Sequence, residues 1–574
     1  NTKPEYDFFS EGDKIFLFKW DSYSNSKISF ELDTDILIKN DFPKIRNTVS
    51  FPLSGIPEGI KEDYTVGTEK LDINEFIKAK SNELAAGETD LFVVSYKIAD
   101  WVKNNIKYDL NTLTADADQK SSWVFANKQG VCDEITNLFI SMLRSVKIPA
   151  RFVSGIVYSN IDNSFGNHGW AEVYFPGYGW IPFDVTFGQY GWIDPTHLKL
   201  DDSADSGVPS VEYHWSSREL EIKAEALDFK TDIVSKDGRL TPYVDIAIRP
   251  LKEKVKFGSY VPVEVSVENL KDYYLPMSIH ITKAPELIKK ANGAYFVMKP
   301  KGKKYFYWLV KIPADLEEDY IYTSELAVKT VFGNIASNTI KYADTFEFYS
   351  EIWAEALMGD LVERETKFFF SNLDISCESD KDTYYSIEDA NIVCLIKNAG
   401  NVQLDEVRTC LADNCGKIAL SIGEEKELTF KKDLVKTETV IISAENEDMV
   451  RYFNLQLNVV EVPDLQVSGI QPTDIGYYES DNLLISLVTD SPAYNVKVRV
   501  EGLGVAEWEK IQDKSIMKIP FEGSSVSDGI IDVKMSYEDE LGKVYTKDLE
   551  LSITVNNIPS YAKFFNWLKN LFRS

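Results

Sequence analysis

The stretch from Gln129 to Thr186 decides the fold of the first half of this chain. It opens as Gln129-Gly-Val-Cys132-Asp-Glu and continues as an apolar helical run to Ile148-Pro-Ala-Arg151. It resumes as Asn167-His168-Gly-Trp-Ala-Glu-Val-Tyr, turns at Pro-Gly-Tyr-Gly, and returns as Trp180-Ile-Pro-Phe-Asp184-Val-Thr. One cysteine, one histidine and one aspartate follow one another, and a thiol, an imidazole and a carboxylate are the parts of a cysteine acyl-transfer site.

Cys132 stands at the predicted start of a helix that carries apolar residues at the 3.6-residue period and stops before Pro149. A thiol at a helix N-terminus feels the positive end of the helix dipole, so we expect its pKa to fall. The backbone N–H of Cys132 is also a natural donor to an oxyanion. The structural alternative is a small buried hydrophobic residue, which is the common fate of a single cysteine.

His168 is one of only four histidines, and it opens a predicted strand that alternates with Trp170, Glu172 and Tyr174. The Pro176–Gly179 turn predicts a hairpin that brings Asp184 near His168. Asp184 would then orient the imidazole, which would serve as the base toward Cys132 or as the imidazolium of an ion pair. The alternatives are a structural histidine and a strand-end turn residue.

These motifs closely resemble the transglutaminase-like core family of the papain-like cysteine protease superfamily. The resemblance covers residues 85 to about 200 and implies Cys132 as nucleophile, His168 as general base and acid, and Asp184 as orienting carboxylate. The second oxyanion donor has no motif to assign it, and Gln129 and Trp123 are its candidates. Arg151 resembles a structural position of the family. The aromatic residues Trp170, Tyr178 and Trp180 are candidates for shaping a substrate pocket, and Trp180 also resembles a structural position.

The whole chain is too long for one core, since 574 residues correspond to several domains. Short strands separated by Gly, Pro, Asn and Asp predict an N-terminal β domain or extension over residues 1–70, including Lys14–Trp20 and Thr48–Phe51. Helices followed by strands predict an α+β transglutaminase-like catalytic domain over 71–215. The predicted helices include one from about Ile73 and one over Leu91–Ile106.

From about Val244 the sequence predicts only strands, in three blocks of about 100 residues. We expect tandem β-sandwiches over 240–350, 366–462 and 463–556, joined in one place by a helical or irregular linker near Glu351–Arg364. These blocks resemble the Ig-like, adhesion-type modules of prokaryotic surface proteins, with an archaeal-type layout. Residues 557–574 predict an amphipathic helix with an aromatic face over 561–573 flanked by Lys and Arg. Contact with a membrane surface and docking on the last sandwich are equally compatible with it.

The other four cysteines, Cys377, Cys394, Cys410 and Cys415, lie within one block and allow three disulfide connectivities. We favour Cys377–Cys394 and Cys410–Cys415, because the second pair brackets a tight loop. Disulfides indicate an oxidising, extracytoplasmic compartment. The alternative is four reduced, buried cysteines in a cytosolic protein, and the spacing argues against zinc.

The formal net charge of −29 argues against nucleic acid as a partner, because phosphate binding needs clustered Lys and Arg. No run of 18 apolar residues is present that would predict a membrane-spanning helix. The chain predicts no cofactor and no metal centre. Two acidic loop groups, Asp116 with Asp118 and Asp201 with Asp202 and Asp205, could bind calcium, although solvated loop charge explains them better.

Two functions from different classes fit these observations. The first is an extracytoplasmic cysteine enzyme that attacks protein amide bonds through a thioester, as a peptidase, a deamidase or a transamidating cross-linker. The second is a catalytically silent cell-surface scaffold or adhesin that uses the same domains to bind a surface protein. An intracellular glycan-releasing amidase fits less well, because the sandwiches suit the cell exterior.

Overall fold

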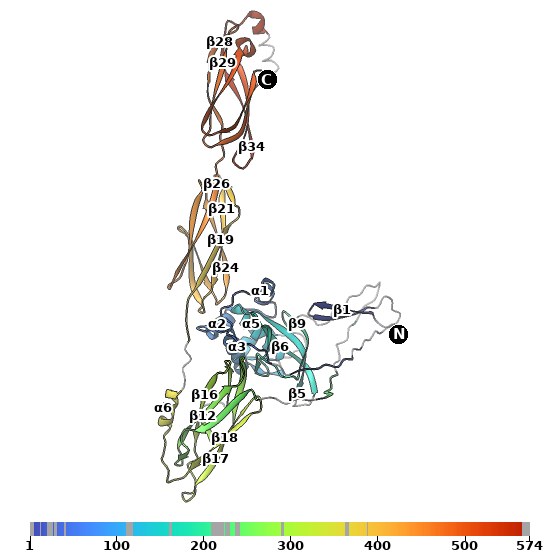
Figure 1. Cartoon of the computed structure of the whole chain (residues 1–574), viewed down its shortest axis with the longest axis vertical. Coiled ribbons are helices and arrows are strands. Elements are labelled where there is room, and N and C mark those ends of the chain that lie inside the picture. The colour runs from blue at the N-terminus through green and yellow to red at the C-terminus, as the bar shows by residue number, and fades with distance from the viewer. Residues whose placement is uncertain are drawn as a thin grey trace.

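The structure is a computed structural model, and it arranges the chain as an elongated array with a mixed helix–sheet core between two β-sandwiches and a third sandwich at the far end (Figure 1). It describes residues 5–11, 13–19, 27, 31, 33–39, 42–110, 119–159, 164–207, 223, 230–235, 242–288, 292–361, 367–386 and 388–564. The expected order of an α+β core followed by tandem all-β sandwiches is confirmed.

The core packs helices against one antiparallel sheet of strand order β8-β7-β6-β5-β9. Its helices are α2 (Glu75–Ala85), α3 (Leu91–Asn105), α4 (Ser121–Asn127) and α5 (Cys132–Ser145). Its strands are β5 (Ala150–Ser159), β6 (Ser164–Phe175), β7 (Gly179–Asp184), β8 (Gln189–Tyr190) and β9 (His197–Ser203). A short parallel pair, β3 (Lys107–Tyr108) with β4 (Gln129–Gly130), leads into α5.

Helix α5 is the centre of this core, and it packs against α2, α3, α4, β5 and β6. Every residue from Glu134 to Ser145 is buried. A helix buried on all sides needs partners for its polar groups. Arg144 is fully buried, and its guanidinium donates to the carbonyls of Ala150, Val66 and Ala204. These bonds tie the end of α5 to β5 and to two loops.

Among its described residues, the N-terminal region departs from the predicted strands at Thr48–Phe51. A hairpin of β1 (Glu5–Glu11) and β2 (Asp13–Lys19) is present, but Thr48–Phe51 contributes only an isolated bridge between Ser50 and Asp90. The N–H of Phe51 donates to Thr89, and the buried side chains of Ile45 and Phe51 join the core cluster. The short apolar run is therefore a covering segment of the core rather than a strand of its own sheet. Helix α1 (Glu58–Tyr64) follows it.

Three β-sandwiches follow, each of which has two main sheets. Sandwich 1 has sheets β10-β12-β16-β14 and β11-β18-β17-β13-β15, from β10 (Val244–Pro250), β11 (Lys254–Val255), β12 (Tyr260–Asn269), β13 (Leu275–Lys283), β14 (Glu286–Ile288), β15 (Gly293–Met298), β16 (Lys303–Lys311), β17 (Tyr322–Thr330) and β18 (Ile335–Tyr342). Helix α6 (Glu351–Leu361) begins the connection to sandwich 2.

Sandwich 2 has sheets β19-β21-β24 and β20-β26-β25-β22-β23. Its strands are β19 (Leu373–Ser379), β20 (Thr383–Tyr385), β21 (Asp389–Asn398), β22 (Leu404–Leu411), β23 (Asn414–Leu420), β24 (Glu425–Asp433), β25 (Glu438–Glu445) and β26 (Val450–Val460). It contains both disulfides favoured from the sequence, and each joins directly paired residues: Cys377 with Cys394 and Cys410 with Cys415.

Sandwich 3 has main sheets β27-β29-β32 and β31-β30-β33-β34, with the short pair β28-β35. Its strands are β27 (Gln466–Gln471), β28 (Asp474–Gly476), β29 (Ser480–Val488), β30 (Ala493–Val500), β31 (Gly504–Ile511), β32 (Lys514–Glu522), β33 (Ile530–Glu538), β34 (Val544–Ser552) and β35 (Thr554–Asn556). A short 3-10 helix, Gly523–Val526, lies between β32 and β33.

One detail repeats in all three sandwiches. The short second strand of each pairs in parallel with the last strand, as β11 with β18, β20 with β26 and β28 with β35. In sandwiches 1 and 2 the third strand ends on a buried asparagine, Asn269 or Asn398, whose amide donates to the following turn and to a second loop. The three blocks are therefore copies of one structural module.

The core shares side chains with both neighbouring sandwiches. Tyr274 of sandwich 1 stacks on Phe92 of α3 and donates its hydroxyl to Asp90 at 2.6 Å. On the other side, the N–H of Ile422 in sandwich 2 donates to Asn82 of α2 at 2.9 Å. Tyr274 and Ile422 both belong to the core's own hydrophobic cluster. The sheet and helices of the core are thus supported from two directions (Figure 1).

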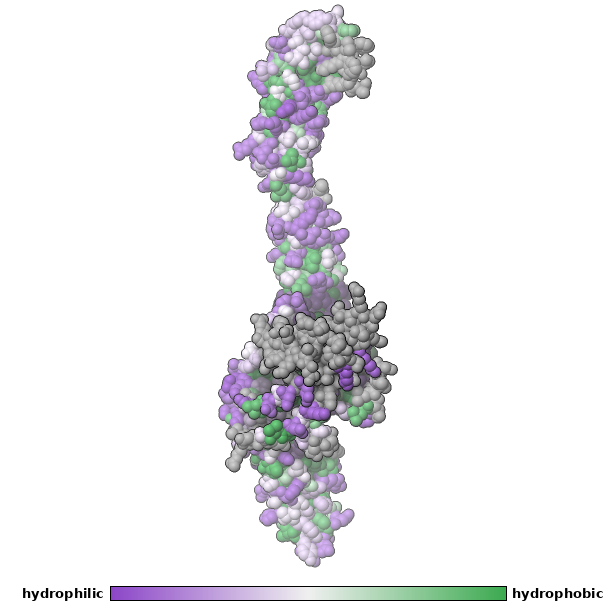
Figure 2. All heavy atoms as spheres, turned by 90° about the vertical axis from the view of Figure 1, so that its right-hand side faces the viewer, coloured by the Kyte–Doolittle hydropathy of each residue, from purple (hydrophilic) through white to green (hydrophobic). Residues whose placement is uncertain are grey.

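The surface seen in Figure 2 is mostly hydrophilic along the sandwiches, with hydrophobic residues scattered between. None of the helices that the structure describes is long and apolar enough to cross a membrane. The amphipathic helix predicted over 557–574 lies largely outside the described residues, which end at Phe564. In the described part of this segment, the hydroxyls of Tyr561 and Tyr478 lie 3.4 Å apart.

Candidate active site

Cys132 is the first residue of α5, and its position is fixed by the buried carboxylate of Glu134. The Glu134 side chain accepts from the N–H of Val131 at 3.0 Å and from the N–H of Gln119 at 2.9 Å. On the other side of the helix start, the Thr136 hydroxyl donates to the Gly169 carbonyl of β6 at 3.1 Å. A Cβ atom on Gly169 would lie 2.4 Å from Asp133 Oδ1, so glycine is needed for this approach. The thiol therefore lies beside the residue that follows His168.

The thiol is half-buried and donates to Asp133 Oδ1 at 3.4 Å. Burial raises the pKa of Cys132 to about 12, and the charge of Asp133 adds to this effect, while the backbone N–H of Gly169 acts in the opposite direction. The expected fall in the pKa is therefore wrong for this arrangement. The helix-dipole argument omitted burial and the neighbouring carboxylate. The described residues include no direct hydrogen bond between Cys132 and His168.

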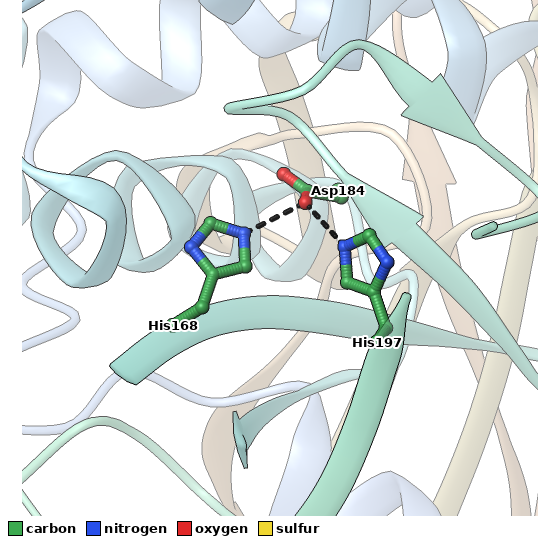
Figure 3. Close-up of side chains that lie close together, drawn as sticks. All are labelled: His168, Asp184 and His197. Carbon is green, nitrogen blue, oxygen red and sulfur yellow. Dashed lines mark hydrogen bonds and ion pairs between the residues drawn. The ribbon is translucent and has the colours of Figure 1, made fainter. Parts of the chain in front are cut away.

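His168 lies within β6 rather than at its start, and its ring is held by Asp184 at the end of β7. His168 Nε2 and Asp184 Oδ2 are 2.7 Å apart (Figure 3). The other oxygen, Oδ1, accepts from the N–H groups of Thr186 and Phe187 at 2.8 and 2.9 Å. Both side chains are almost completely buried. The hairpin thus brings the predicted histidine and aspartate together, and the second ring nitrogen of His168 points away from Asp184 (Figure 3).

A second histidine, which the sequence analysis did not identify, shares the same carboxylate. His197 Nε2 lies 3.0 Å from Asp184 Oδ2, opposite His168 (Figure 3). Its Nδ1 lies 3.2 Å from Asp194 Oδ1, and Asp194 is in turn bound by Gln189 and Thr196. These four residues, His168, Asp184, His197 and Asp194, are called the imidazole network below.

The protonation states of this network follow from its hydrogen bonds. Burial alone would raise the pKa of Asp184, but hydrogen bonds and charge from His168 and His197 hold it well below its usual value. Burial would lower the pKa of His197, but Asp184 and Asp194 together raise it to about 9. Asp184 is therefore an anion and His197 a cation at neutral pH. Because an ionised carboxylate can only accept, the Nε2 atoms of both histidines must donate to it.

His168, Asp184 and His197 are close enough to be considered as metal ligands, since their ligating atoms lie within 4.8 Å of one another. A metal ion needs a lone pair on each ligating nitrogen. Both Nε2 atoms instead carry the protons that they donate to Asp184. The donor set therefore fits a hydrogen-bond network, and we assign no metal to it.

Two exposed aromatic side chains lie next to the candidate residues. The ring of Phe187 stacks on His168 with centroids 4.8 Å apart, and Phe187 is 44% exposed. Tyr108 pairs in parallel with Gly130 and lies within hydrogen-bonding reach of the Cys132 thiol, where burial raises the pKa of its hydroxyl. The sequence analysis assigned a function to neither. Gly130, the partner of Tyr108, lies two residues before Cys132, so this pairing brings the Tyr108 side chain next to the thiol.

The other candidate residues lie in different places. Trp170 is buried, and its ring packs against both His168 and His197, so it supports the network by packing. Tyr178 and Trp180 lie at the turn of the β6–β7 hairpin, where they contact Arg46, Asn47 and Tyr64. Trp180 pairs with Tyr174, six residues along β6 from His168, which corresponds to roughly 20 Å. The structure does not bring these two residues to Cys132.

The two oxyanion candidates lie upstream of Cys132. Gln129 is in β4 and pairs in parallel with Lys107. Trp123 is in α4, packed against the core cluster. Neither side chain forms a hydrogen bond with Cys132 in the described part of the chain.

The far end of the same sheet carries a second charged cluster, called the guanidinium network below: Arg151, Glu172, Lys199 and Asp202. Arg151 pairs with Glu172 at 2.7 Å and with Asp202 at 2.5 Å, and its guanidinium covers the Trp180 ring at 4.3 Å. Lys199 pairs with both carboxylates. Asp202 therefore has cationic partners within the protein, and Asp205 accepts from Thr68 and Gly207. Asp116 and Asp118, the other calcium candidates, lie outside the described residues.

A family model described as the transglutaminase-like superfamily matches residues 78–185. These residues form a transglutaminase-like domain. The match contains Cys132, His168 and Asp184, whereas Asp194 and His197 lie beyond its end. This match agrees with the resemblance seen in the sequence.

Two curated relatives share this region. One is an uncharacterised protein, YebA of Bacillus subtilis, which is 28% identical over 166 residues, covering 25% of this chain and 22% of the relative. The other is an uncharacterised protein of Haemophilus influenzae, 26% identical over 144 residues, covering 21% of this chain and 39% of the relative. The chain thus spans well under half the length of either relative.

Solved structures resemble separate parts of the chain. A crystal structure named as a candidate cysteine protease from Cytophaga hutchinsonii covers 28% of this chain and 52% of its own, at 19% identity and a TM-score of 0.24. A region of a bacterial ice-binding adhesin covers 55% of this chain and 99% of its own, at 12% identity and a TM-score of 0.22. At these TM-scores neither likeness carries an argument about function.

Proposed function

We propose that the transglutaminase-like domain is a cysteine acyl-transfer enzyme that acts on protein amide bonds outside the cytoplasm. Cys132 is its nucleophile, His168 its general base and acid, and Asp184 the carboxylate that orients His168. The observation that carries the proposal is the pairing of His168 with Asp184 on β6 and β7, next to the strand position that contacts the start of α5.

The chemistry follows from the free nitrogen of His168. As Cys132 Sγ attacks the amide carbon, a C–S bond forms and the thiol proton passes to His168 Nδ1. The imidazolium then protonates the leaving nitrogen as the C–N bond breaks, which leaves a thioester. Water resolves the thioester in a peptidase or deamidase, and a Lys amine resolves it in a transamidase. In this second step His168 takes a proton from the water or the amine, the C–S bond breaks, and the proton passes from His168 to Cys132 Sγ, which restores the thiol and the neutral imidazole.

The resting state in this proposal is a thiol and a neutral imidazole. With its pKa near 12, the thiol is protonated at neutral pH, and it donates to Asp133. Deprotonation therefore accompanies attack rather than preceding it. Tyr108 and Phe187, the exposed aromatic residues beside Cys132 and His168, are the surfaces against which a peptide substrate would pack.

The location rests on the two disulfides of sandwich 2, because disulfides persist in oxidising compartments. A protein substrate or a partner on a cell surface fits the array of three sandwiches. A formal net charge of −29 disfavours nucleic acid as the substrate.

Alkylation of the native protein by iodoacetamide, read by mass spectrometry without reductant, tests the proposal. Cys132 is the single free cysteine, so the label reports one site. We expect native Cys132 to react faster at pH 7 than the same cysteine in the protein unfolded in guanidinium chloride, because only the fold supplies His168. Native Cys132 that reacts more slowly than unfolded Cys132 would show that the fold merely buries the thiol, and would contradict the proposal.

A scaffold or adhesin function is the second candidate, and it is favoured by one observation: the thiol contacts Asp133 rather than His168. In that case Cys132→Ala leaves the biological activity of the protein unchanged. In the enzyme proposal the same substitution removes all turnover, while the surface assembly of the sandwiches persists. Comparing turnover and assembly in this one variant separates the two.

A further inference from the structure

The carboxylate of Asp184 has more hydrogen bonds than the orientation of one histidine needs. Oδ1 accepts two backbone N–H groups, and Oδ2 accepts from two imidazoles, at 2.7 Å from His168 and 3.0 Å from His197. Asp184 and His197 are both completely buried. A buried ion pair costs desolvation energy and is rarely kept for stability alone. A role of His197 in the chemistry of this site would explain why the second imidazole is present.

The chain takes an indirect route to place His197 there. Asp184 lies on β7 and His197 opens β9, and the sheet order separates these strands by β6 and β5. The ring of Trp170 lies against both His168 and His197, with centroids 6.2 and 5.3 Å away. A Cβ atom on Gly155 of β5 would lie 2.5 Å from the Trp170 ring, so glycine at this position lets the tryptophan cross the sheet. The site is built across the width of the sheet.

His197 is also held from its far side. Its Nδ1 faces both the Oδ1 and the carbonyl of Asp194 at 3.2 Å, and Asp194 is fixed by Gln189 and by the turn at Thr196. With a carboxylate at each ring nitrogen, His197 donates from both, and only the imidazolium can do so. The cation lies directly against Asp184 and offsets its charge.

We propose that His197, held by Asp194, is a positioning residue that fixes Asp184 and offsets its negative charge, so that His168 keeps a free lone pair for the thiol. The inference rests on the proposed function of Cys132 and His168. Without His197, the full charge of Asp184 would act on His168 and favour its imidazolium, which cannot accept a proton.

Other charged groups among the described residues also act on this site. His168 lies 5.8 Å from His197 between ring centroids. Lys103 of α3 donates to the Thr186 carbonyl at 2.6 Å and interacts electrostatically with Asp184, and burial lowers the pKa of this lysine. Asp194 and Asp184 are the two groups whose charge acts on His197. His197 therefore differs from Lys103, because it contacts the Asp184 carboxylate directly and is held on its other side by Asp194.

The test is the pH–rate profile for acylation of Cys132 by 4-nitrophenyl acetate, in the wild type and in His197→Gln. Glutamine keeps a donor for Asp184 but carries no charge. We expect the acid limb of the profile to move up by about one pH unit, so that the rate falls roughly tenfold near pH 6 and returns to within about twofold of wild type above pH 8. Asp194→Asn should shift the limb in the same direction by less. His280→Gln, in sandwich 1, is the control and should leave it in place.

The outcomes separate this inference from the proposed function. If Cys132→Ser releases nitrophenol as fast as wild type, Cys132 is not the nucleophile and the proposed function fails. If Cys132 is acylated but His197→Gln and Asp194→Asn lower the rate equally at every pH, or leave it unchanged, only the inference on His197 is wrong. Because Asp194→Asn leaves both histidines in place, it keeps the test decisive if His197→Gln does not fold.

Discussion

The imidazole network and the guanidinium network lie on the same sheet and have the same composition of two basic residues and two carboxylates. They share strands β6 and β9, and His168 and Glu172 are four residues apart on β6. In the guanidinium network each carboxylate pairs with cations that stay charged, and Lys199 is 36% exposed. In the imidazole network the basic groups are imidazoles, and the side chains of Asp184 and His197 are fully buried. In the proposed function, the guanidinium network holds strands together, whereas the imidazole network takes part in proton transfer.

The largest contrast is expected from matched substitutions on β6. His168→Gln should lower the rate of Cys132 alkylation at pH 7 by roughly 10²- to 10⁴-fold, the usual contribution of a general base. Glu172→Gln removes a charge from the same strand and should leave the rate within about twofold of wild type. Equal alkylation rates in the two variants would contradict a functional difference between the two networks.

Of the two networks, the imidazole network should give stability the stronger dependence on pH. The pKa of His197 is about 9 in the folded protein, against 6.5 ordinarily, so its contribution is complete below about pH 6.5 and is lost as the pH rises through 9. Between pH 6.5 and 9.5 the free energy of unfolding should fall by about 3 kcal/mol. Urea unfolding at the two pH values measures this difference. His197→Gln should flatten this slope. An unchanged slope in that variant would assign the effect to another group.

Removing the central cation of the guanidinium network should affect stability without affecting chemistry. Arg151→Met leaves Glu172 and Asp202 partly buried with Lys199 as their remaining cation, and it removes the contact with Trp180. We expect a loss of about 1 to 3 kcal/mol in the free energy of unfolding, between the values for exposed and buried pairs. Cys132 alkylation below the unfolding transition should be unchanged. A matching fall in that rate would mean that the two networks are coupled.

The smallest expected effect concerns the carboxylate that lies beside the thiol. Asp133 accepts from Cys132 and raises its pKa, so Asp133→Asn should lower that pKa. The alkylation rate at pH 8 should rise about three- to tenfold, because the thiolate fraction increases. Asp133→Glu retains the charge and is the control. A rate that falls in Asp133→Asn would indicate that Asp133 supports the reactive state.

The local patterns of the sequence predicted much of this arrangement. The apolar period of α5 and the turn at Pro176–Gly179 placed Cys132 at a helix start and paired His168 with Asp184 across a hairpin. The cysteine spacing indicated both disulfides, since each joins neighbouring strands. These features depend on residues that are close in sequence or joined by one turn.

The features that were missed depend on contacts across the sheet. His197 reaches Asp184 only because the chain passes from β8 at one edge to β9 at the other, and no local period encodes that path. The short motif Asp194-Pro-Thr-His197, with a turn-forming aspartate three residues before a rare histidine, was the available signal. The prediction of a lowered pKa for Cys132 was wrong for a similar reason, because the burial of its thiol depends on the whole fold. Thr48–Phe51 has a strand-like composition, but its apolar side chains pack onto the core instead of forming a strand of a separate sheet.

The most direct test of the account is detection of an acyl-enzyme on Cys132. Wild-type protein, His168→Gln and Glu172→Gln would be mixed with 4-nitrophenyl acetate at pH 7, quenched in acid within seconds, and mapped by peptide mass spectrometry. The account predicts an acetyl group on Cys132 in wild type and in Glu172→Gln, and almost none in His168→Gln. Acetylation of Cys132 to the same extent in all three proteins, or of surface lysines alone, would contradict the assignment of Cys132 and His168 as a catalytic pair.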